Sequence, residues 1–165
     1  MRRTKHSSIG TLVLISLVAG IGSLSPNRAA GQAEHGKALN PDTLKWAPAP
    51  PLLPKGAEFA VLFGDPTKPG PFIVRLKVPA GYKIPAHSHS SFEAVTVISG
   101  DFNIGMGDKL DESKAEKLRP GGFIFLPEKM DHFAFATSES IVQIDSVGPF
   151  DIKYVNPADD PRKTQ

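Results

Sequence analysis

The sequence predicts an all-β protein in which antiparallel strands form a sandwich or a barrel. From residue 58 onward, short runs of alternating apolar and polar residues follow one another, and clusters of Gly, Pro and Asp separate them. In this part of the sequence only the charged stretch 108–119 could form a helix, and we expect a long loop with a short strand there instead. Regularly spaced short strands with frequent turns are typical of antiparallel sandwiches and barrels.

Eight runs are expected to be strands. In the second of them, Arg75 and Lys77 are expected to point outward, because the alternate residues are apolar and form the face toward the core. The histidine-containing stretch 87–97 occurs once, which argues for one domain without an internal repeat. The expected strands are 58–63, 72–78, 92–98, 101–107, 122–127, 132–137, 141–147 and 150–155.

Residues 1–33 have the layout of a secretory signal peptide. A basic start with Arg2, Arg3 and Lys5 precedes the apolar run 9–24, and small residues follow, with cleavage expected after Gly31 or Ala33. The alternative is an uncleaved membrane anchor, but the apolar run is short for a bilayer crossing, which takes roughly 20 residues. We therefore expect a periplasmic or secreted protein that has no membrane contact once the signal is removed.

The charge balance of the exported chain argues against nucleic acid as a partner. Four of the 19 basic residues lie within residues 1–33, so the remainder carries 15 basic and 17 acidic residues and a net charge of −2. A chain without a basic surplus lacks the electrostatic footprint of nucleic-acid binding. The sequence contains no cysteine, so a metal site must use imidazole and carboxylate ligands.

Two flanking segments differ in composition from the strand region. Residues 34–57 are rich in proline, and we expect an extended arm that lies on the domain through Trp46, Leu52 and Leu53. A mobile linker is the alternative. The polar residues 156–165 are expected to form a flexible C-terminal tail.

Two histidines and a glutamate suggest a metal site. His87 and His89 are one residue apart, and Glu93 follows four residues later. If 87–97 runs as one strand without a bulge, these three odd-numbered side chains point the same way, and two valines continue their face. A metal pocket above an apolar core has this pattern. The alternative is a polar strand with ordinary hydrogen-bonded histidines.

A further histidine comes about forty residues later. His132 opens the run 132–137, and its neighbours on the same face are Ala134 and Ala136. Small residues beside a buried histidine leave space, and an unfilled void costs stability, so other side chains or a ligand must fill it. Ala134 and Ala136 are therefore candidate substrate-binding positions.

These residues resemble the two motifs of the cupin superfamily, the small β-barrels that include germins. The first motif matches at every position, namely Gly81, His87, His89, Glu93 and Gly100. The second matches at Gly121, Pro127 and His132, whereas Lys129 stands in place of a glycine and Ala136 in place of an asparagine. The resemblance covers about residues 58–155. It implies a single cupin-type antiparallel barrel, a double-stranded β-helix or jelly roll.

The resemblance also implies the ligand set His87, His89, Glu93 and His132. Imidazole and carboxylate suit several divalent transition metals, so Mn, Fe, Zn, Ni and Cu all remain open. Glu93 is either a ligand or an unbound carboxylate that acts as a base. Single-barrel cupins commonly dimerise, so a homodimer is expected, with the proline-rich arm placed to reach a partner subunit.

Two functions from different classes fit these residues. The first is a small metalloenzyme of the dioxygenase, decarboxylase or isomerase type that acts on a small oxygenated molecule. Gln143 and Asp145 share one face of the run 141–147; if that face is inward, Asp145 is a candidate catalytic residue and Gln143 a candidate substrate contact. The second is a non-catalytic periplasmic module that binds or senses a metal or a small ligand.

Overall fold

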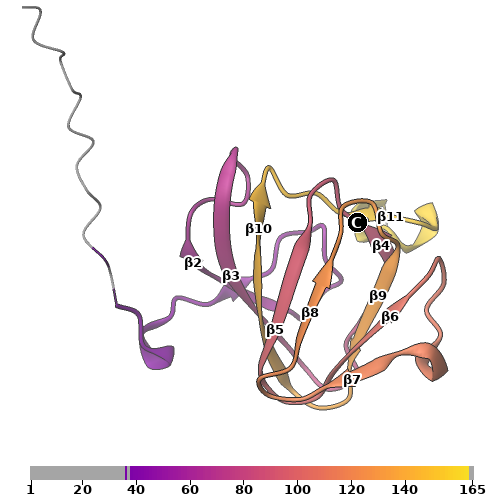
Figure 1. Cartoon of the computed structure of the whole chain (residues 1–165), viewed down its shortest axis with the longest axis horizontal. Coiled ribbons are helices and arrows are strands. Elements are labelled where there is room, and N and C mark those ends of the chain that lie inside the picture. The colour runs from indigo at the N-terminus through magenta and orange to yellow at the C-terminus, as the bar shows by residue number, and fades with distance from the viewer. Residues whose placement is uncertain (1–35, 37, 164–165) are drawn as a thin grey trace, which may run out of the picture. The chain divides into compact units, whose positions relative to one another are not determined.

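Two antiparallel sheets lie face to face and enclose the core (Figure 1). The computed structural model describes residue 36 and residues 38–163, so the predicted signal peptide, residues 1–33, lies outside the described residues. No helix among the described residues is long and apolar enough to cross a membrane. The prediction of an all-β fold is confirmed, and strands of both sheets contribute residues to the candidate site.

The first sheet contains six strands. Its spatial order interleaves distant segments, because β10 pairs with both β3 and β5. In spatial order the strands are β1 (Ala47–Pro48), β2 (Glu58–Phe63), β3 (Gly70–Val78), β10 (Ser140–Gly148), β5 (Glu93–Ser99) and β8 (Phe123–Leu126).

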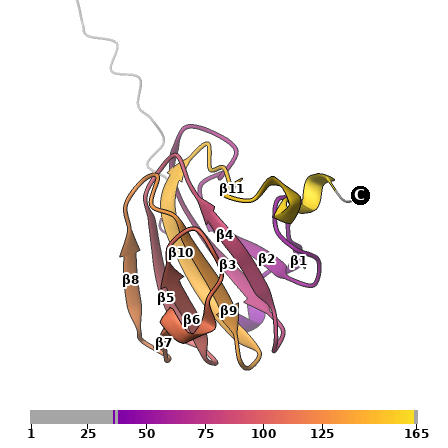
Figure 2. The same ribbon diagram turned by 90° about the vertical axis from the view of Figure 1, so that its right-hand side faces the viewer.

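The second sheet contains five strands and faces the first (Figure 2). Here β9 lies between β4 and β6, so the chain crosses repeatedly from one sheet to the other, as in a jelly roll. In spatial order the strands are β11 (Lys153–Tyr154), β4 (Lys83–Ser88), β9 (His132–Ala136), β6 (Phe102–Met106) and β7 (Glu116–Leu118).

The main core lies between the two sheets and consists of alternate residues of the facing strands. Along β3, the four apolar residues at even positions are buried, as the alternation predicted, and Arg75 and Lys77 lie on the other face. Burial of each such aliphatic or aromatic side chain contributes about 1.5–3 kcal/mol to the stability of the fold. The largest fully buried apolar residues on this inner side are Phe72, Leu76, Leu126, Val74, Val78, Val97 and Val142.

A second, smaller cluster covers the outer face of the five-stranded sheet. Phe133 and Phe135 point away from the core, as predicted, but they are buried together with Ala86. The charged loop after β6, which contains the 3-10 turn η2 (Glu112–Lys114) and ends in β7, supplies the apolar residues Leu110 and Ala115 as a cover. This loop therefore holds β9, and the histidine at its start, in place from outside.

Residues 87–97 do not form one strand, so the condition set for a shared strand face is not met. β4 ends at Ser88, residues 89–92 turn, and β5 begins at Glu93 in the opposite sheet. Within β4 a register shift between Ile84 and His87 lets both side chains point inward despite their odd spacing. The three groups thus share the interior because two sheets face each other, and not because they share one strand.

The proline-rich arm packs on its own barrel from residue 46 onward. β1 pairs with β2, and the Trp46 ring lies 4.9 Å from the ammonium nitrogen of Lys77. Leu53 packs against the core, and the Tyr154 hydroxyl donates a hydrogen bond to the Leu52 carbonyl at 2.8 Å. These contacts are made within one chain, so they require no partner subunit. The arm also contains a short 3-10 turn, η1 (Pro41–Thr43).

The C-terminal segment is more regular than the predicted loose tail. Two 3-10 turns, η3 (Pro157–Asp159) and η4 (Pro161–Lys163), follow β11. Asn156 caps the first turn, because its side-chain oxygen accepts from the Ala158 amide at 3.1 Å. Arg162 donates to the Ile152 carbonyl at 3.1 Å and pairs with Asp160, which ties the segment back to the barrel.

Candidate metal centre

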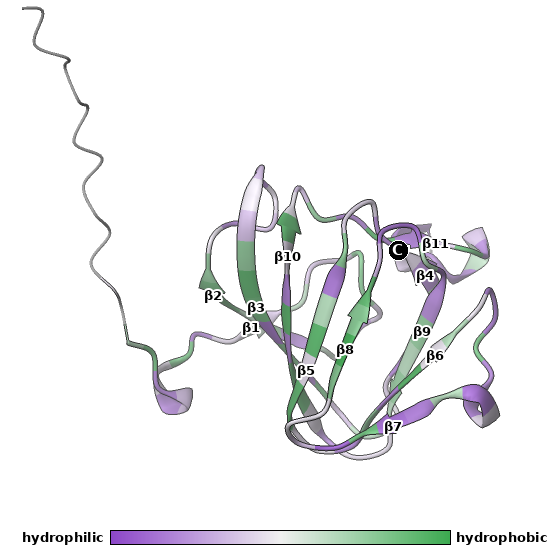
Figure 3. Cartoon of the chain, in the orientation of Figure 1, coloured by the Kyte–Doolittle hydropathy of each residue, from purple (hydrophilic) through white to green (hydrophobic). Residues whose placement is uncertain are grey.

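Three histidine rings converge inside one end of the barrel. The ring centroids of His87 and His132 are 4.2 Å apart, those of His87 and His89 are 4.9 Å apart, and those of His89 and His132 are 5.2 Å apart. All three residues are buried, as is Glu93. β5 and β9 are largely hydrophobic along their length but hydrophilic at one end (Figure 3), and they begin with Glu93 and His132 respectively.

Each ring is oriented by a backbone carbonyl. The Nδ1 atoms of His87, His89 and His132 lie 2.7, 2.6 and 2.9 Å from the carbonyl oxygens of Pro85, Asp151 and Met130. A carbonyl oxygen only accepts, so each Nδ1 must carry the hydrogen and donate it. In the neutral rings the Nε2 atoms are then unprotonated. Metal-binding histidines usually have this arrangement, in which a backbone group fixes the tautomer and the ring direction.

The unprotonated nitrogens face a carboxylate. Glu93 Oε2 lies 3.4 Å from His89 Nε2 and 3.3 Å from His132 Nε2. Neither contact is a hydrogen bond, and both Nε2 atoms are buried without a hydrogen-bond partner. A lone pair that faces a carboxylate in a buried site is unfavourable unless a cation, either a proton or a metal ion, lies between them.

The donor set fits a metal ion. One nitrogen of each of the three rings lies within 4.8 Å of the others. Two ligands at about 2.1 Å from one ion, at a tetrahedral angle, are about 3.4 Å apart. The separations between Glu93 Oε2 and the two Nε2 atoms match that distance. The three imidazoles can therefore hold a metal ion, and the Glu93 carboxylate lies at a ligand-to-ligand distance from two of them.

The pKa values of His87, His89 and Glu93 are displaced from their ordinary values. Burial, and then the positive charges of His132 and His89, lowers the pKa of His87 to about 3. Burial also acts to lower the pKa of His89, but the close Glu93 carboxylate outweighs it, and the net pKa is raised. Burial acts to raise the pKa of Glu93, yet its contacts with His132 and His89 outweigh that effect and lower the pKa. Without a metal, the raised pKa of His89 favours a proton on its ring beside the carboxylate.

Several solved structures share this fold. The polyketide cyclase RemF from Streptomyces resistomycificus matches with a TM-score of 0.64 and 16% identity, over 78% of this chain and 92% of that chain. A candidate acetylacetone dioxygenase from Methylibium petroleiphilum matches with a TM-score of 0.58 and 18% identity, over 77% and 85% of the two chains. An RmlC-like cupin from Shewanella frigidimarina matches with a TM-score of 0.53 and 16% identity, over 70% and 94%. The chain has the cupin fold.

The similarity of this chain to the three solved structures lies in the fold and not in the sequence. No family model matches the sequence, and no curated protein matches it significantly. The cupin expectation for the fold is confirmed by the two facing antiparallel sheets and by the matching structures.

Lys129, which stands in place of a motif glycine, keeps the backbone conformation of that glycine. Lys129 adopts the left-handed conformation, with φ of 62°, that the expected glycine would adopt, so the tight turn is retained. The Lys129 amide donates to the His89 carbonyl at 2.8 Å, which ties the turn before β9 to the histidine turn. The motif glycine Gly100 also has a positive φ, and a Cβ there would lie 2.2 Å from the Glu139 carbonyl oxygen.

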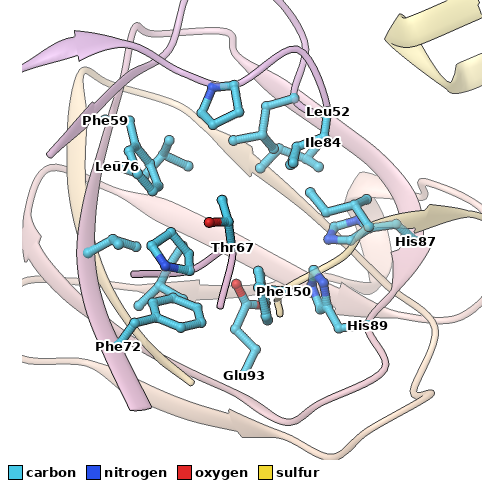
Figure 4. Close-up of a pocket in the computed structure, with 16 residues that line it drawn as sticks. Leu52, Phe59, Thr67, Phe72, Leu76, Ile84, His87, His89, Glu93 and Phe150 are labelled. Atoms are coloured by element: carbon cyan, nitrogen blue, oxygen red, sulfur yellow. Dashed lines mark ion pairs between the residues drawn. The ribbon is translucent and has the colours of Figure 1, made fainter. Parts of the chain in front are cut away.

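An apolar cavity of about 130 Å³ opens onto the histidines (Figure 4). His87, His89 and Glu93 form part of its wall, and the remaining wall is apolar apart from Thr67. Leu52 of the arm contributes to this wall, together with residues of β3, β4 and β10. The arm is thus part of the site, a role that the sequence analysis did not assign to it.

The two candidate alanines have different environments. Ala134 lines a smaller cavity of about 30 Å³ that lies against His87, His132 and Glu93. Ala136 is buried in the main core, and neither cavity touches it. Phe102, its partner across the β6–β9 ladder, belongs to the same core cluster, so core packing takes the space that we expected a ligand to fill.

Gln143 and Asp145 lie outside the site, which corrects their predicted roles. On β10 the inward positions are the even ones, because Val142 and Ser146 are buried and Ile144 lines both cavities. Gln143 donates to Asp145 at 3.3 Å on the other face of the sheet. From there Asp145 can neither orient a ligand histidine nor transfer a proton in the cavity.

Two contributions to the site could not be found from residue types. The groups that orient the rings are main-chain carbonyls, which every residue has. Phe150 stacks on His89 with a centroid distance of 4.3 Å and an interplanar angle of 19°. Phe150 belongs to the predicted run 150–155, but nothing in that run indicated that it would reach the histidines.

Proposed function

We propose that this chain is an exported metalloenzyme that binds one divalent transition metal ion through His87, His89, Glu93 and His132. The observation that carries the proposal is the pair of buried, unpartnered Nε2 atoms that face the Glu93 carboxylate. A metal ion bound there would supply Lewis-acid polarisation of a substrate oxygen. The ligand set suits Mn, Fe, Zn, Ni and Cu and does not select among them.

The protein residues prepare the site for such a reaction. The carbonyls of Pro85, Asp151 and Met130 hold the three rings, so little reorganisation is needed when a cation binds. The apolar wall of the cavity excludes water and strengthens electrostatic interactions at the histidines. Both effects favour catalysis over simple storage of an ion.

The cavity limits the type of reaction. Among the described residues that line the two cavities, the three histidines and Glu93 are the ionisable ones. A mechanism with a separate general acid and general base therefore has no support here. We propose a dioxygenase, decarboxylase or isomerase type of reaction on a small oxygenated molecule. The lowered pKa of Glu93 keeps its carboxylate ionised, as a metal ligand or as an unbound base. The names of two similar structures, a cyclase and a candidate dioxygenase, agree with a small-molecule substrate.

Turnover by the reconstituted protein tests this function. The metal-free protein is loaded separately with Fe, Mn and Zn and assayed against a panel of small oxygenated molecules. We expect metal-dependent turnover that His89→Ala abolishes while the barrel remains folded by circular dichroism. Turnover that survives His89→Ala would show that the metal centre takes no part in the reaction.

The alternative is a non-catalytic module that binds a metal or a small ligand. The lack of a further ionisable group on the described cavity wall is the observation that favours it. X-ray absorption of the loaded protein separates the two functions. A coordination sphere that includes water supports the enzyme, whereas an ion fully enclosed by protein ligands supports the module.

The cellular setting is also part of the proposal. The layout of residues 1–33 supports export to the periplasm or the medium. The cupin fold is compatible with a homodimer, and the molecular mass of the signal-free chain in solution tests that expectation.

A further inference from the structure

The cavity wall contains no partner for a second charged group. Apart from the four candidate ligands, the described wall consists of apolar side chains and Thr67, whose hydroxyl already donates to Asp65 at 2.7 Å. Arg75 and Lys77 lie on the outer face of β3. A substrate carboxylate or ammonium placed against this wall would lose its hydration and gain no ion pair, which is unfavourable.

The charge at the histidines sets what can bind there. A divalent ion together with the Glu93 carboxylate leaves one net positive charge in a buried, apolar setting. One anionic oxygen donor, or a neutral one, is compatible with that charge. A second anionic group, even one bound to the same ion, exceeds that charge, and the described residues of the wall provide no further cation to balance it.

We propose that the site takes a compact, largely apolar molecule that carries a single oxygen-donor group and no second charge. This inference rests on the proposed function, because it assumes the metal ion as the anchor for the donor oxygen. The apolar body lies along the wall that Leu52, Phe72 and Leu76 form (Figure 4). Polar metabolites with two carboxylates are excluded.

The volume limits the size of the apolar body. An engineered cavity of about 150 Å³ with an apolar lining binds benzene. The cavity here, at about 130 Å³, therefore suits a molecule of roughly six to eight non-hydrogen atoms. Leu52, Leu53 and Thr67 are not fully buried, and they come from the arm and from the β2–β3 turn. A larger molecule has room to extend between these two segments.

Two probes with the same skeleton test the charge rule. 3-Methylbutanoate and malonate each have seven non-hydrogen atoms, and two methyl groups of the first correspond to two carboxylate oxygens of the second. The metal content of the protein is measured first, and binding is then followed by calorimetry and by the visible spectrum of the cobalt-loaded protein. We expect 3-methylbutanoate to bind at least about tenfold more tightly, although malonate is the better chelator of a free metal ion.

A charged substitution on the wall tests the charge rule in the opposite direction. Leu52→Lys places a cation beside the cavity and should shift the preference toward malonate by about tenfold or more. Leu39→Lys, at an exposed arm position outside the cavity wall, should leave the preference unchanged. Equal or tighter malonate binding by the metal-loaded wild type overturns the inference, as does binding of neither probe. A protein that takes up no metal instead contradicts the proposed function.

Discussion

At the residue scale, the chemistry of this molecule depends on which histidine nitrogens carry no hydrogen. Three Nδ1 atoms donate to main-chain carbonyls, which leaves lone pairs on the opposite nitrogens, and two of these face an acidic side chain. Asp151 contributes to the arrangement twice. Its carbonyl oxygen accepts from His89, and its carboxylate accepts from the Ser90 amide at 2.7 Å and the Ser90 hydroxyl at 2.8 Å. This contact fixes the turn that carries the second histidine.

Replacing Glu93 by glutamine should change metal affinity and stability in opposite directions. The introduced amide lacks the negative charge but can donate a hydrogen to an unpartnered Nε2 atom. We expect Glu93→Gln to lower metal affinity by at least about a hundredfold, while the unfolding temperature of the metal-free protein stays equal or rises. Calorimetric titration and thermal unfolding measure the two effects. Glu128→Gln, at an exposed position, serves as the control, and an unchanged affinity in Glu93→Gln would mean that Glu93 is not a ligand.

Lys129 should be a position where glycine stabilises the fold. A non-glycine residue in the left-handed conformation, such as Lys129, destabilises the fold by roughly 1–2 kcal/mol. A glycine at this position removes that cost, but part of the gain in stability is lost because glycine has greater freedom in the unfolded chain. Lys129→Gly is expected to raise the free energy of unfolding by about 1 kcal/mol in urea denaturation. Lys129→Ala removes the same contact with Glu128 but keeps the Cβ atom, so it should give no gain. An equal gain in both variants would argue against backbone strain.

At the element scale, the alternation of side chains predicted most strands because it reflects burial on one face. The ends of β2 match the prediction, and the ends of β5, β6, β8 and β9 lie within a residue or two of the predicted ends. The register shift in β4 was not predictable, because pairing with β9 creates it and the local sequence does not. The run 141–147 is apolar at both odd and even positions, so alternation could not decide which face Gln143 occupies.

The contact between β6 and the ring of Phe133 gives a prediction about packing. A Cβ atom at Gly105 would lie 2.1 Å from that fully buried ring, which the loop after β6 holds in place. Gly105→Ala should therefore lower the free energy of unfolding by about 1–3 kcal/mol, as overpacking does. Gly36→Ala, at a residue outside the compact unit that contains β6 and Phe133, should have little effect. Similar stabilities of the two variants in chemical denaturation would contradict this packing.

At the scale of the whole molecule, the site depends on the closure of two sheets. His87, His89 and His132 come from the five-stranded sheet and the turn that follows β4, whereas Glu93 begins a strand of the other sheet. The sequence motifs identified the four residues, but no local pattern could supply the distances between them. A cation at this position therefore links the two sheets and should contribute to global stability.

The stability of the metal-free protein should be greatest near pH 6.5, about the ordinary pKa of histidine. Below about 6.5 the unfolded chain binds a proton at His87 that the folded chain binds only near pH 3, so stability falls with acidification. The pKa of His89 is raised, so its contribution is complete below about 6.5 and is lost as the pH rises through the folded value. A bound metal ion replaces that proton, so the loaded protein should not lose stability on the alkaline side. Urea denaturation at pH 5, 6.5 and 8, with and without a chelator, measures both curves, and identical curves would exclude the ion from the site.

The most direct measurement is the metal content of the protein recovered from its own export route, compared with that of His132→Ala. Elemental analysis of the wild type should give one transition metal ion per chain. His132→Ala removes the ligand contributed by β9 and should lose most of the metal while circular dichroism still reports a folded barrel. A folded wild type that recruits no metal, or a variant that retains the full amount, would contradict the metal centre on which this account depends.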